Sequence, residues 1–238
     1  MNEKSIIAHA RAQGRAALDE ASGKALLAGR GIAVPRGVVV GESDDLHALL
    51  AGMRFPVVCK IMSPEVLHKS DAGGVQVGLR DAGEVAAARA RMAASDALRG
   101  VRIDGYLVEE MAPAGLELVV GGLRDPWFGP MLMVGLGGVF VEVLGDVAFR
   151  ICPIEAIDAR EMLDELAGAA LLDGCRGQPA VSRDVIVDVL LRVGGAGGLL
   201  MALRDDIAEA DINPLIVSAQ GAVAADARFI LAPRGADA

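Results

Sequence analysis

Short apolar runs, bounded by glycine, proline or charged residues, recur along the chain and alternate with segments of helical periodicity. Short apolar runs suit strands, whereas apolar residues spaced three and four apart suit one face of a helix. The predicted strands of the first half are Val34 to Val40, Val57 to Ile61 and Val75 to Leu79. The predicted helices are the stretch through Arg30, a segment from Ser43 or Asp44 to about Ala51, and a segment from Asp81, with Glu84 at the capping-box spacing, to about Ala94.

The second half is predicted to be richer in strands and to close with a hairpin. Its predicted strands are Tyr106 to Met111, Glu117 to Gly121, Met131 to Val134, Val147 to Ile151, Asp211 to Val217 and Val223 to Leu231. A helix is predicted from Asp158, and another from Ser182 to the glycine cluster that begins at Gly194. No low-complexity linker divides the halves. The sequence therefore predicts one α/β module, 1–238, with α+β lobes: a smaller one at about 31–105 and a larger one at about 106–238 that includes the N-terminal helix.

Composition narrows the classes of function. Hydrophobic residues make up 53% of the chain and aromatic residues 3%, so aliphatic side chains must fill a globular core. The net charge of −9 argues against nucleic acid or an anionic membrane as a partner. The most apolar stretch, Trp127 to Val141, is shorter than the roughly 20 residues of a spanning helix. Three scattered cysteines and no secretory signal predict a cytoplasmic protein, with Cys59 as a small core residue.

Lys60 ends an apolar strand and has no acidic residue beside it in the sequence. A buried charge without a partner costs several kcal/mol, so the amine has three possible fates. It reaches solvent, finds a carboxylate from a distant part of the chain, or holds an anion such as phosphate. A lysine that extends from a strand end into solvent is an equally good interpretation of this residue alone.

The segment from Leu67 to Val75 is the densest in chemically active side chains. It places His68 beside Lys69, Ser70 and Asp71, and it continues into Gly73 and Gly74. Paired glycines allow backbone amides to approach phosphate oxygens, and a neutral imidazole can act as a base or a phosphoryl acceptor. The segment lacks the Gly-Lys-Ser/Thr ending of a Walker A loop. Taken alone, it is best interpreted as a polar surface turn.

Two further groups of acidic or amide side chains are candidates. Glu109, Glu110 and Glu117 occupy or flank apolar strands, where a carboxylate needs a donor or a metal, although most such residues are solvated. In the final hairpin, a two-residue turn at Ala219-Gln220 places Asn213 directly opposite Asp226, and a turn one residue later makes them diagonal neighbours. Both arrangements suit Mg²⁺, which takes few protein oxygens. A three-residue loop would separate them, and an ordinary polar pair remains an equal alternative.

Together these segments resemble the ATP-grasp domain of the NDP-forming acyl-CoA synthetases, the family that includes ADP-forming acetyl-CoA synthetase. The resemblance runs from about Gly23 to Leu231. It rests on Pro56 to Lys60, Leu67 to Val75, Asp125 to Pro130, Gly135 to Asp146, Arg176-Gly177, Asp211 to Leu215, and Asp226-Ala227. It implies an ATP-grasp fold of two lobes with the nucleotide bound between them, and an acid–thiol ligase that interconverts acyl-CoA, nucleoside diphosphate and phosphate with acid, CoA and nucleoside triphosphate.

The resemblance also implies roles for individual residues. Lys60, together with the amides of Gly73 and Gly74, would contact the phosphates of ATP or ADP. Residues Glu109, Glu110 and Met111 would line the adenine pocket, and Glu117 would bind the ribose. Asn213 and Asp226 would hold Mg²⁺, and His68 would match the second phosphohistidine proposed for the ADP-forming branch.

The chain contains no CoA-binding segment and no half that carries the partner's phosphohistidine. The leading hypothesis is therefore a nucleotide-binding β-type subunit that acts with a CoA-binding α-type subunit. The alternatives are an autonomous ATP-grasp ligase that forms an acyl phosphate, and a nucleotide-binding regulatory subunit without catalysis. The sequence does not name the acyl group or the nucleotide base.

Overall fold

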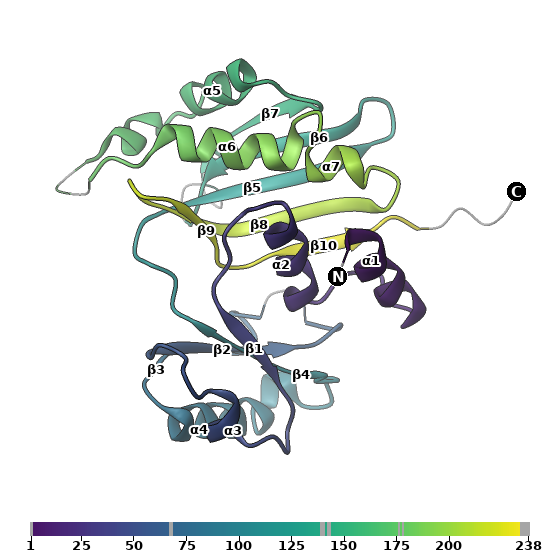
Figure 1. Cartoon of the computed structure of the whole chain (residues 1–238), viewed down its shortest axis with the longest axis vertical. Coiled ribbons are helices and arrows are strands. Elements are labelled where there is room, and N and C mark those ends of the chain that lie inside the picture. Colours follow the sequence, from purple (N-terminus) through teal and green to yellow (C-terminus); the bar gives the residue numbers. More distant parts are fainter. Residues whose placement is uncertain are drawn as a thin grey trace, which may run out of the picture. The chain divides into compact units, whose positions relative to one another are not determined.

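The structure is a computed structural model that describes residues 2–66, 69–138, 141, 144–175, 177 and 179–233. Its chain separates into two compact units, each with its own hydrophobic core. The smaller unit comprises Asp19–Ala21 and Pro35–Ala112, and the larger unit comprises Met1–Leu18, Ser22–Val34 and Pro113–Ala238. Figure 1 labels the elements of both units.

The smaller unit is a four-stranded antiparallel sheet with two helices packed on it (Figure 1). Its elements are β1 (Gly37–Val40), α3 (Leu46–Leu49), β2 (Val57–Met62), β3 (Val75–Leu79), α4 (Ala82–Ala93), the 3₁₀ helix η1 (Asp96–Leu98) and β4 (Gly105–Glu110). The strand order is β1-β4-β2-β3, so β2 and β4 are the central strands and are buried along their whole length. The predicted core position of Cys59 is confirmed, and burial raises the pKa of its thiol to about 12.

The larger unit is built on a second antiparallel sheet, with order β10-β8-β5-β6-β7 and with β9 paired to β8. Its strands are β5 (Leu116–Asp125), β6 (Gly129–Leu136), β7 (Val147–Ile151), β8 (Ile207–Val217), β9 (Ala222–Ala224) and β10 (Arg228–Leu231). Its helices are α1 (Glu3–Ala12), most of α2 (Glu20–Gly29), α5 (Ala156–Asp164), the 3₁₀ helix η3 (Ala169–Asp173), α6 (Arg183–Gly194) and α7 (Leu199–Ala202).

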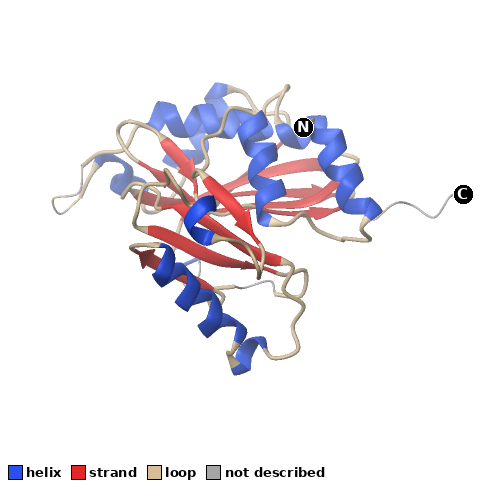
Figure 2. Cartoon of the chain, turned by 60° about the horizontal axis from the view of Figure 1, so that its bottom comes forward, coloured by secondary structure: helices blue, strands red, loops and turns tan. Residues whose placement is uncertain are grey.

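Helices α5, α6 and α7 lie on one face of this sheet (Figures 1 and 2). The fully buried side chains of Leu118, Leu132, Leu190 and Phe229 lie in the core of this unit. Helix α2 packs very closely on β10: a Cβ atom added to Gly23 would lie 3.0 Å from the Phe229 ring. The close approach explains why this helical position is glycine despite its low helix propensity.

Several predicted boundaries are confirmed. Strands β3 and β7 have the predicted bounds, and α6 begins after Ser182, whose hydroxyl accepts a hydrogen bond from the Val185 amide at 3.3 Å. The Asp81 carboxylate caps α4 as predicted, but the Glu84 carboxylate accepts from the Arg80 amide instead of completing a capping box.

Other predicted boundaries are wrong. The N-terminal stretch forms two helices, interrupted at Gly14 with a φ of 69°. Helix α3 is capped by Asp45, not by Ser43 or Asp44. Helix α5 begins at Ala156, because Glu155 is its N-cap and Asp158 is the third helical residue. The last strand is split into β9 and β10.

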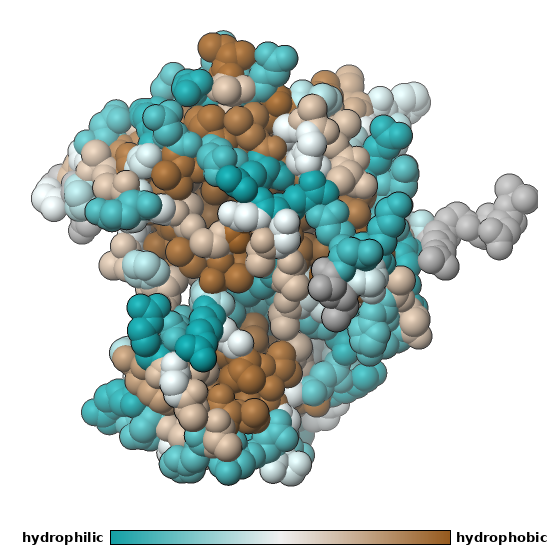
Figure 3. Space-filling model, viewed as in Figure 1, coloured by the Kyte–Doolittle hydropathy of each residue, from teal (hydrophilic) through white to brown (hydrophobic). Residues whose placement is uncertain are grey.

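Charged side chains cover the outward side of α6, which Figure 3 shows as a hydrophilic band along that helix. Asp188 and Arg192, one turn apart, form an ion pair of 2.6 Å on this side. None of the described helices is both long and apolar enough to cross a membrane.

Candidate functional site

Lys60 lies on β2 with its ammonium group buried between two carboxylates. Its Nζ lies 2.5 Å from Glu20 Oε1 and 3.0 Å from Glu109 Oε2. Glu109 lies opposite Val58 on the neighbouring strand β4, which makes it a diagonal neighbour of Lys60 on the same face of the sheet. Of the three fates inferred for this amine, the structure therefore shows a pairing with carboxylates from distant parts of the chain.

Glu20 bridges a second lysine to this group. Its other carboxylate oxygen, Oε2, accepts from the Lys69 ammonium group. The Glu20 side chain is 2% exposed, and those of Lys60 and Lys69 are 9% and 17% exposed. Lys69 directly follows His68 in the sequence, and His68 lies outside the described residues. We call Glu20, Lys60, Lys69 and Glu109 the lysine cluster.

The lysine cluster balances two positive charges with two negative charges in a buried environment. Two ammonium groups would repel each other without the shared carboxylate, and the repulsion grows as water is excluded. Each buried charge would be costly to leave without its partner. The carboxylates therefore keep two ammonium groups ordered close together, which is a useful arrangement for binding a highly charged anion.

Glu110, the last residue of β4, is anchored by Arg54. Its Oε1 accepts from the Arg54 amide at 3.0 Å, and its Oε2 lies 2.7 Å from the Arg54 guanidinium. These hydrogen bonds to the Arg54 backbone and side chain hold the pKa of the Glu110 carboxyl below its usual range. Met111 follows with its side chain 43% exposed. The structure thus fixes the end of β4 and leaves Met111 accessible.

Gly73 and Gly74 form the turn that leads into β3. Gly73 has a φ of 70°, in the region that favours glycine, and its amide donates to the Ser70 carbonyl at 3.1 Å. The Gly74 amide donates to the Lys69 carbonyl at 2.7 Å. A Cβ atom on Gly74 would lie 2.6 Å from Ile61 Cδ1, so close packing requires glycine there. Both amides are used within the turn in this conformation.

Asn213 and Asp226 lie opposite each other in the hairpin register that the sequence predicts for a turn at Ala219-Gln220. Strand β9 pairs with β8 at Leu215 and Ala224, and β10 continues in the same register, with Arg228 opposite Asp211. Asn213 is exposed, and Asp226 is half-buried in the short segment between β9 and β10.

The donor set at this point of the hairpin fits Mg²⁺ better than a structural metal. Within the described part of the chain, no three His, Cys, Asp or Glu side chains gather closely enough to form a metal site. One amide and one carboxylate oxygen suit an ion that takes its remaining ligands from water and from substrate phosphates. Asp226 Oδ1 also accepts from the Ala227 amide at 2.7 Å, which orients the carboxylate.

Glu117 lies one residue inside β5, opposite Ile216 on β8, with its side chain exposed. It belongs to the larger unit, whereas the other predicted nucleotide contacts, Lys60 and residues 109–111, belong to the smaller unit.

The sequence did not point to two acidic residues of these sites, Glu20 in the lysine cluster and Asp211 beside Asn213. Glu20 begins helix α2, forty residues before Lys60, and nothing in its local sequence distinguishes it from an ordinary N-terminal helix carboxylate. Asp211 lies two residues before Asn213 and therefore points to the same face of β8. That period of two was a usable signal for Asp211, whereas no pattern in the sequence pointed to Glu20.

Known proteins match nearly the whole chain. A model of the ATP-grasp domain family matches residues 9–231. The β subunit of the ADP-forming acetate–CoA ligase I of Pyrococcus furiosus is 39% identical over 236 residues, which covers 96% of this chain and 97% of that subunit. The ADP-forming acetate–CoA ligase I of Archaeoglobus fulgidus is 39% identical over 215 residues, but this match covers only 30% of that longer protein.

Solved structures give the same answer. The acetyl-coenzyme A synthetase 1 of Ca. Korarchaeum cryptofilum, in complex with coenzyme A, Ca-AMPCP and HgCl+, matches with a TM-score of 0.90 and 39% identity. This match covers 97% of the present chain and 100% of the other. The predicted family and the predicted ATP-grasp fold are confirmed. The chain belongs to the ATP-grasp family and, within it, to the β-type subunits of the ADP-forming acyl-CoA ligases, which are acid–thiol ligases.

Proposed function

We propose that this chain is the nucleotide-binding subunit of an ADP-forming acyl-CoA ligase and that it transfers a phosphoryl group between a histidine and ADP. The observation that carries the proposal is the match, almost complete in both directions, to a separately encoded β subunit. The longer Archaeoglobus ligase contains the matching segment within a chain more than three times its length. A partner subunit that binds CoA and carries a phosphohistidine therefore supplies the rest of the reaction.

The reaction divides into four displacements. Phosphate attacks the acyl-CoA carbonyl, the C–S bond breaks, and CoA leaves as its thiolate with an acyl phosphate as the product. An imidazole nitrogen of the partner then attacks phosphorus, and the carboxylate leaves. The imidazole of His68 next attacks phosphorus, and the P–N bond to the partner's histidine breaks. Finally a terminal oxygen of ADP attacks phosphorus, the P–N bond to His68 breaks, and ATP forms. The last two displacements belong to this chain, with His68 as the carrier between the partner's histidine and ADP.

The carboxylates of the lysine cluster hold in place the ammonium group that would donate to the nucleotide phosphates. In this proposal Lys60 contacts the phosphates, and the ordered ammonium group of Lys69 lies next in sequence to His68. Gly73 and Gly74 shape the turn that follows His68. The accessible Met111 and the fixed carboxylates of Glu109 and Glu110 border the adenine, and Glu117 binds the ribose. The two compact units are the two lobes of one ATP-grasp module.

Asn213 and Asp226 would hold a Mg²⁺ ion that enters with the nucleotide. The ion would neutralise phosphate charge during transfer. This chain's own contribution is to present one amide oxygen and one oriented carboxylate from opposite sides of the hairpin.

Reconstitution tests the proposed function. We expect a CoA-binding subunit to copurify with the chain, and we expect the pair, but neither subunit alone, to form acetyl-CoA from acetate, CoA and ATP. The matched control is the pair without Mg²⁺, which should be inactive. ATP consumption by the chain alone, dependent on an acid and a nucleophile, would instead indicate an autonomous ligase. Tight ATP binding without phosphoryl exchange in the pair would indicate a regulatory subunit.

A further inference from the structure

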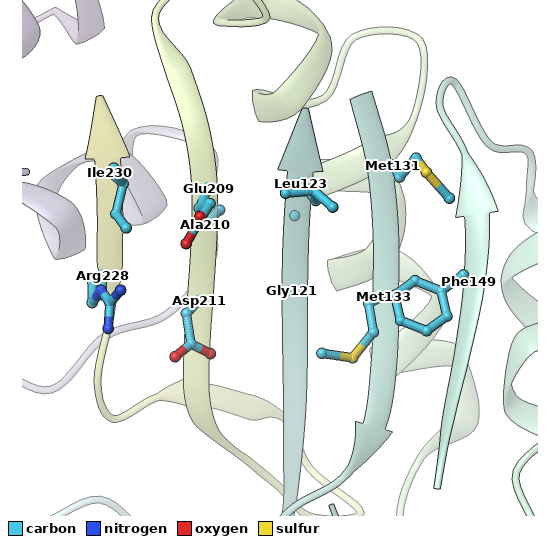
Figure 4. A pocket seen from close by; sticks show the side chains of 11 residues that line it. Gly121, Leu123, Met131, Met133, Phe149, Glu209, Ala210, Asp211, Arg228 and Ile230 are labelled. Atoms are coloured by element: carbon cyan, nitrogen blue, oxygen red, sulfur yellow. The ribbon is translucent and has the colours of Figure 1, made fainter. Parts of the chain in front are cut away.

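The face of the larger sheet opposite α5, α6 and α7 contains a hollow of about 330 Å³ (Figure 4). One row of residues crosses all five strands at this point, and the strand pairings place each member beside the next. From β10 to β7 the row reads Arg228, Asp211, Gly121, Met133 and Phe149. The hollow therefore has a charged wall on β8 and β10 and an apolar wall on β6 and β7.

Gly121 creates the hollow because it stands at the middle of the row without a side chain. A Cβ atom there would lie 2.9 Å from Met133 Cε, so even the smallest side chain would begin to fill the space. Figure 4 shows the Asp211 and Arg228 side chains on one side of Gly121 and those of Met133 and Phe149 on the other. The floor at this point is backbone.

The charged wall shares its face with the proposed metal ligands. Along the last strand, Ala227 and Phe229 are buried in the core, whereas Asp226 and Arg228 alternate with them and are half-buried on the open face. Asp211 and Asn213 likewise alternate with the buried Ile212. The Arg228 guanidinium therefore belongs to the row next to the Asn213 and Asp226 pair.

Arg228 is unusual among the arginines of this unit. Within the part of the chain that the structure describes, its guanidinium forms no hydrogen bond and no ion pair, although Asp211 lies opposite it in the register. Arg150, Arg183 and Arg192, by contrast, are each paired with a carboxylate. A half-buried guanidinium without a partner keeps its N–H donors available for a ligand, and their planar arrangement matches the oxygens of a carboxylate or a phosphate group.

We propose that Arg228 is a catalytic residue that contacts the transferring phosphoryl group in this hollow, an assignment that rests on the proposed function. A phosphoryl group in transfer spreads negative charge over three oxygens, and an arginine fork can bind two of them. The carboxylates of Glu209 and Asp211, which also line the hollow, repel a free anion, so this contact forms only when a divalent cation enters with the nucleotide.

The test compares Arg228→Gln and Arg228→Lys with the unaltered chain in the complete ligase. Both variants are expected to bind MgADP within about threefold of the unaltered affinity, while the single-turnover rate of phosphoryl transfer to ADP falls by about 100-fold or more in Arg228→Gln. Lysine keeps the charge but not the fork, so it should restore only part of the rate. The control is Arg124→Gln, which removes an exposed arginine of β5 and should leave both quantities unchanged.

A second variant tests the hollow independently, in case the Arg228 variants fail to fold. Gly121→Val fills the hollow without removing a charge, and we expect it to lower the transfer rate while the urea midpoint and the MgADP affinity stay close to those of the unaltered chain. A transfer rate in Arg228→Gln within threefold of the unaltered enzyme would overturn the assignment. So would parallel losses of affinity and rate, because they would make Arg228 a nucleotide-binding residue. No transfer by the unaltered ligase would contradict the proposed function itself, and this assignment with it.

Discussion

Replacement of Lys60 by methionine is expected to destabilise the smaller unit by about 3–5 kcal/mol, because it leaves the buried carboxylates of Glu20 and Glu109 without the ammonium group between them. Methionine nearly preserves the side-chain volume, so the loss reflects charge and not a cavity. The measurement is the urea midpoint of unfolding, followed by a probe of the smaller unit. The variant should also bind nucleotide far more weakly if Lys60 contacts its phosphates.

The control for this prediction is Arg80→Met, which removes an exposed cation of the same unit. Arg80 pairs with Glu84 at the surface, so its loss should leave the midpoint nearly unchanged. The triple variant Lys60→Met, Glu20→Gln, Glu109→Gln should recover much of the lost stability, since it removes the uncompensated charges together. Equal midpoints for Lys60→Met and the unaltered chain would show that the ion pairs contribute nothing to stability.

Replacement of Asp226 by asparagine is expected to weaken MgADP binding by about 100-fold or more, because the proposed Asn213 and Asp226 pair loses its carboxylate. Asparagine keeps the oxygen that accepts from the Ala227 amide, so the local backbone should be preserved. Asn213→Ala should have an effect in the same direction. The measurement is titration calorimetry with ADP in the presence of Mg²⁺ and, separately, of a chelator.

The comparison of ADP affinity with Mg²⁺ and with a chelator shows whether the loss in Asp226→Asn depends on the metal. Without Mg²⁺, Asp226→Asn and the unaltered chain should bind ADP equally weakly. Asp205→Asn, which removes an exposed carboxylate of the same unit, serves as the control and should bind MgADP normally. If Asp226→Asn binds MgADP as tightly as the unaltered chain does, the proposed metal site in this hairpin is wrong.

The final hairpin shows how much of the structure local sequence patterns predict in this chain. Its turn residues, together with the period of two, left two registers that bring Asn213 and Asp226 to one face, and the strand pairings on either side have the one that places them directly opposite. The same rules did not predict the break between β9 and β10 at residues 225–227. That break leaves the Ala225 amide hydrogen-bonded to the Pro214 carbonyl at 2.9 Å, a contact that depends on both strands together.

The lysine cluster marks the limit of the same reasoning. The sequence left three fates for the Lys60 amine, of which a distant carboxylate was one, and Glu109 on a nearby apolar strand was already a candidate for a carboxylate in need of a donor. Glu20 was not, because its partners come from β2 and from the turn before β3, and only the folded chain brings these segments to the start of α2. The hollow beside Arg228 was not predicted from the sequence for a similar reason. It depends on the register of five strands and on one glycine at their centre.

The central claim is that this chain passes a phosphoryl group through His68 between its nucleotide and the partner. The most direct measurement is a rapid-mixing experiment with the complete ligase, Mg²⁺ and γ-labelled ATP, in which acid-labile label on each subunit is followed over one turnover. We expect label first on this chain and then on the partner, and no label on either subunit in His68→Ala. Label that reaches the partner in His68→Ala at the unaltered rate would contradict it.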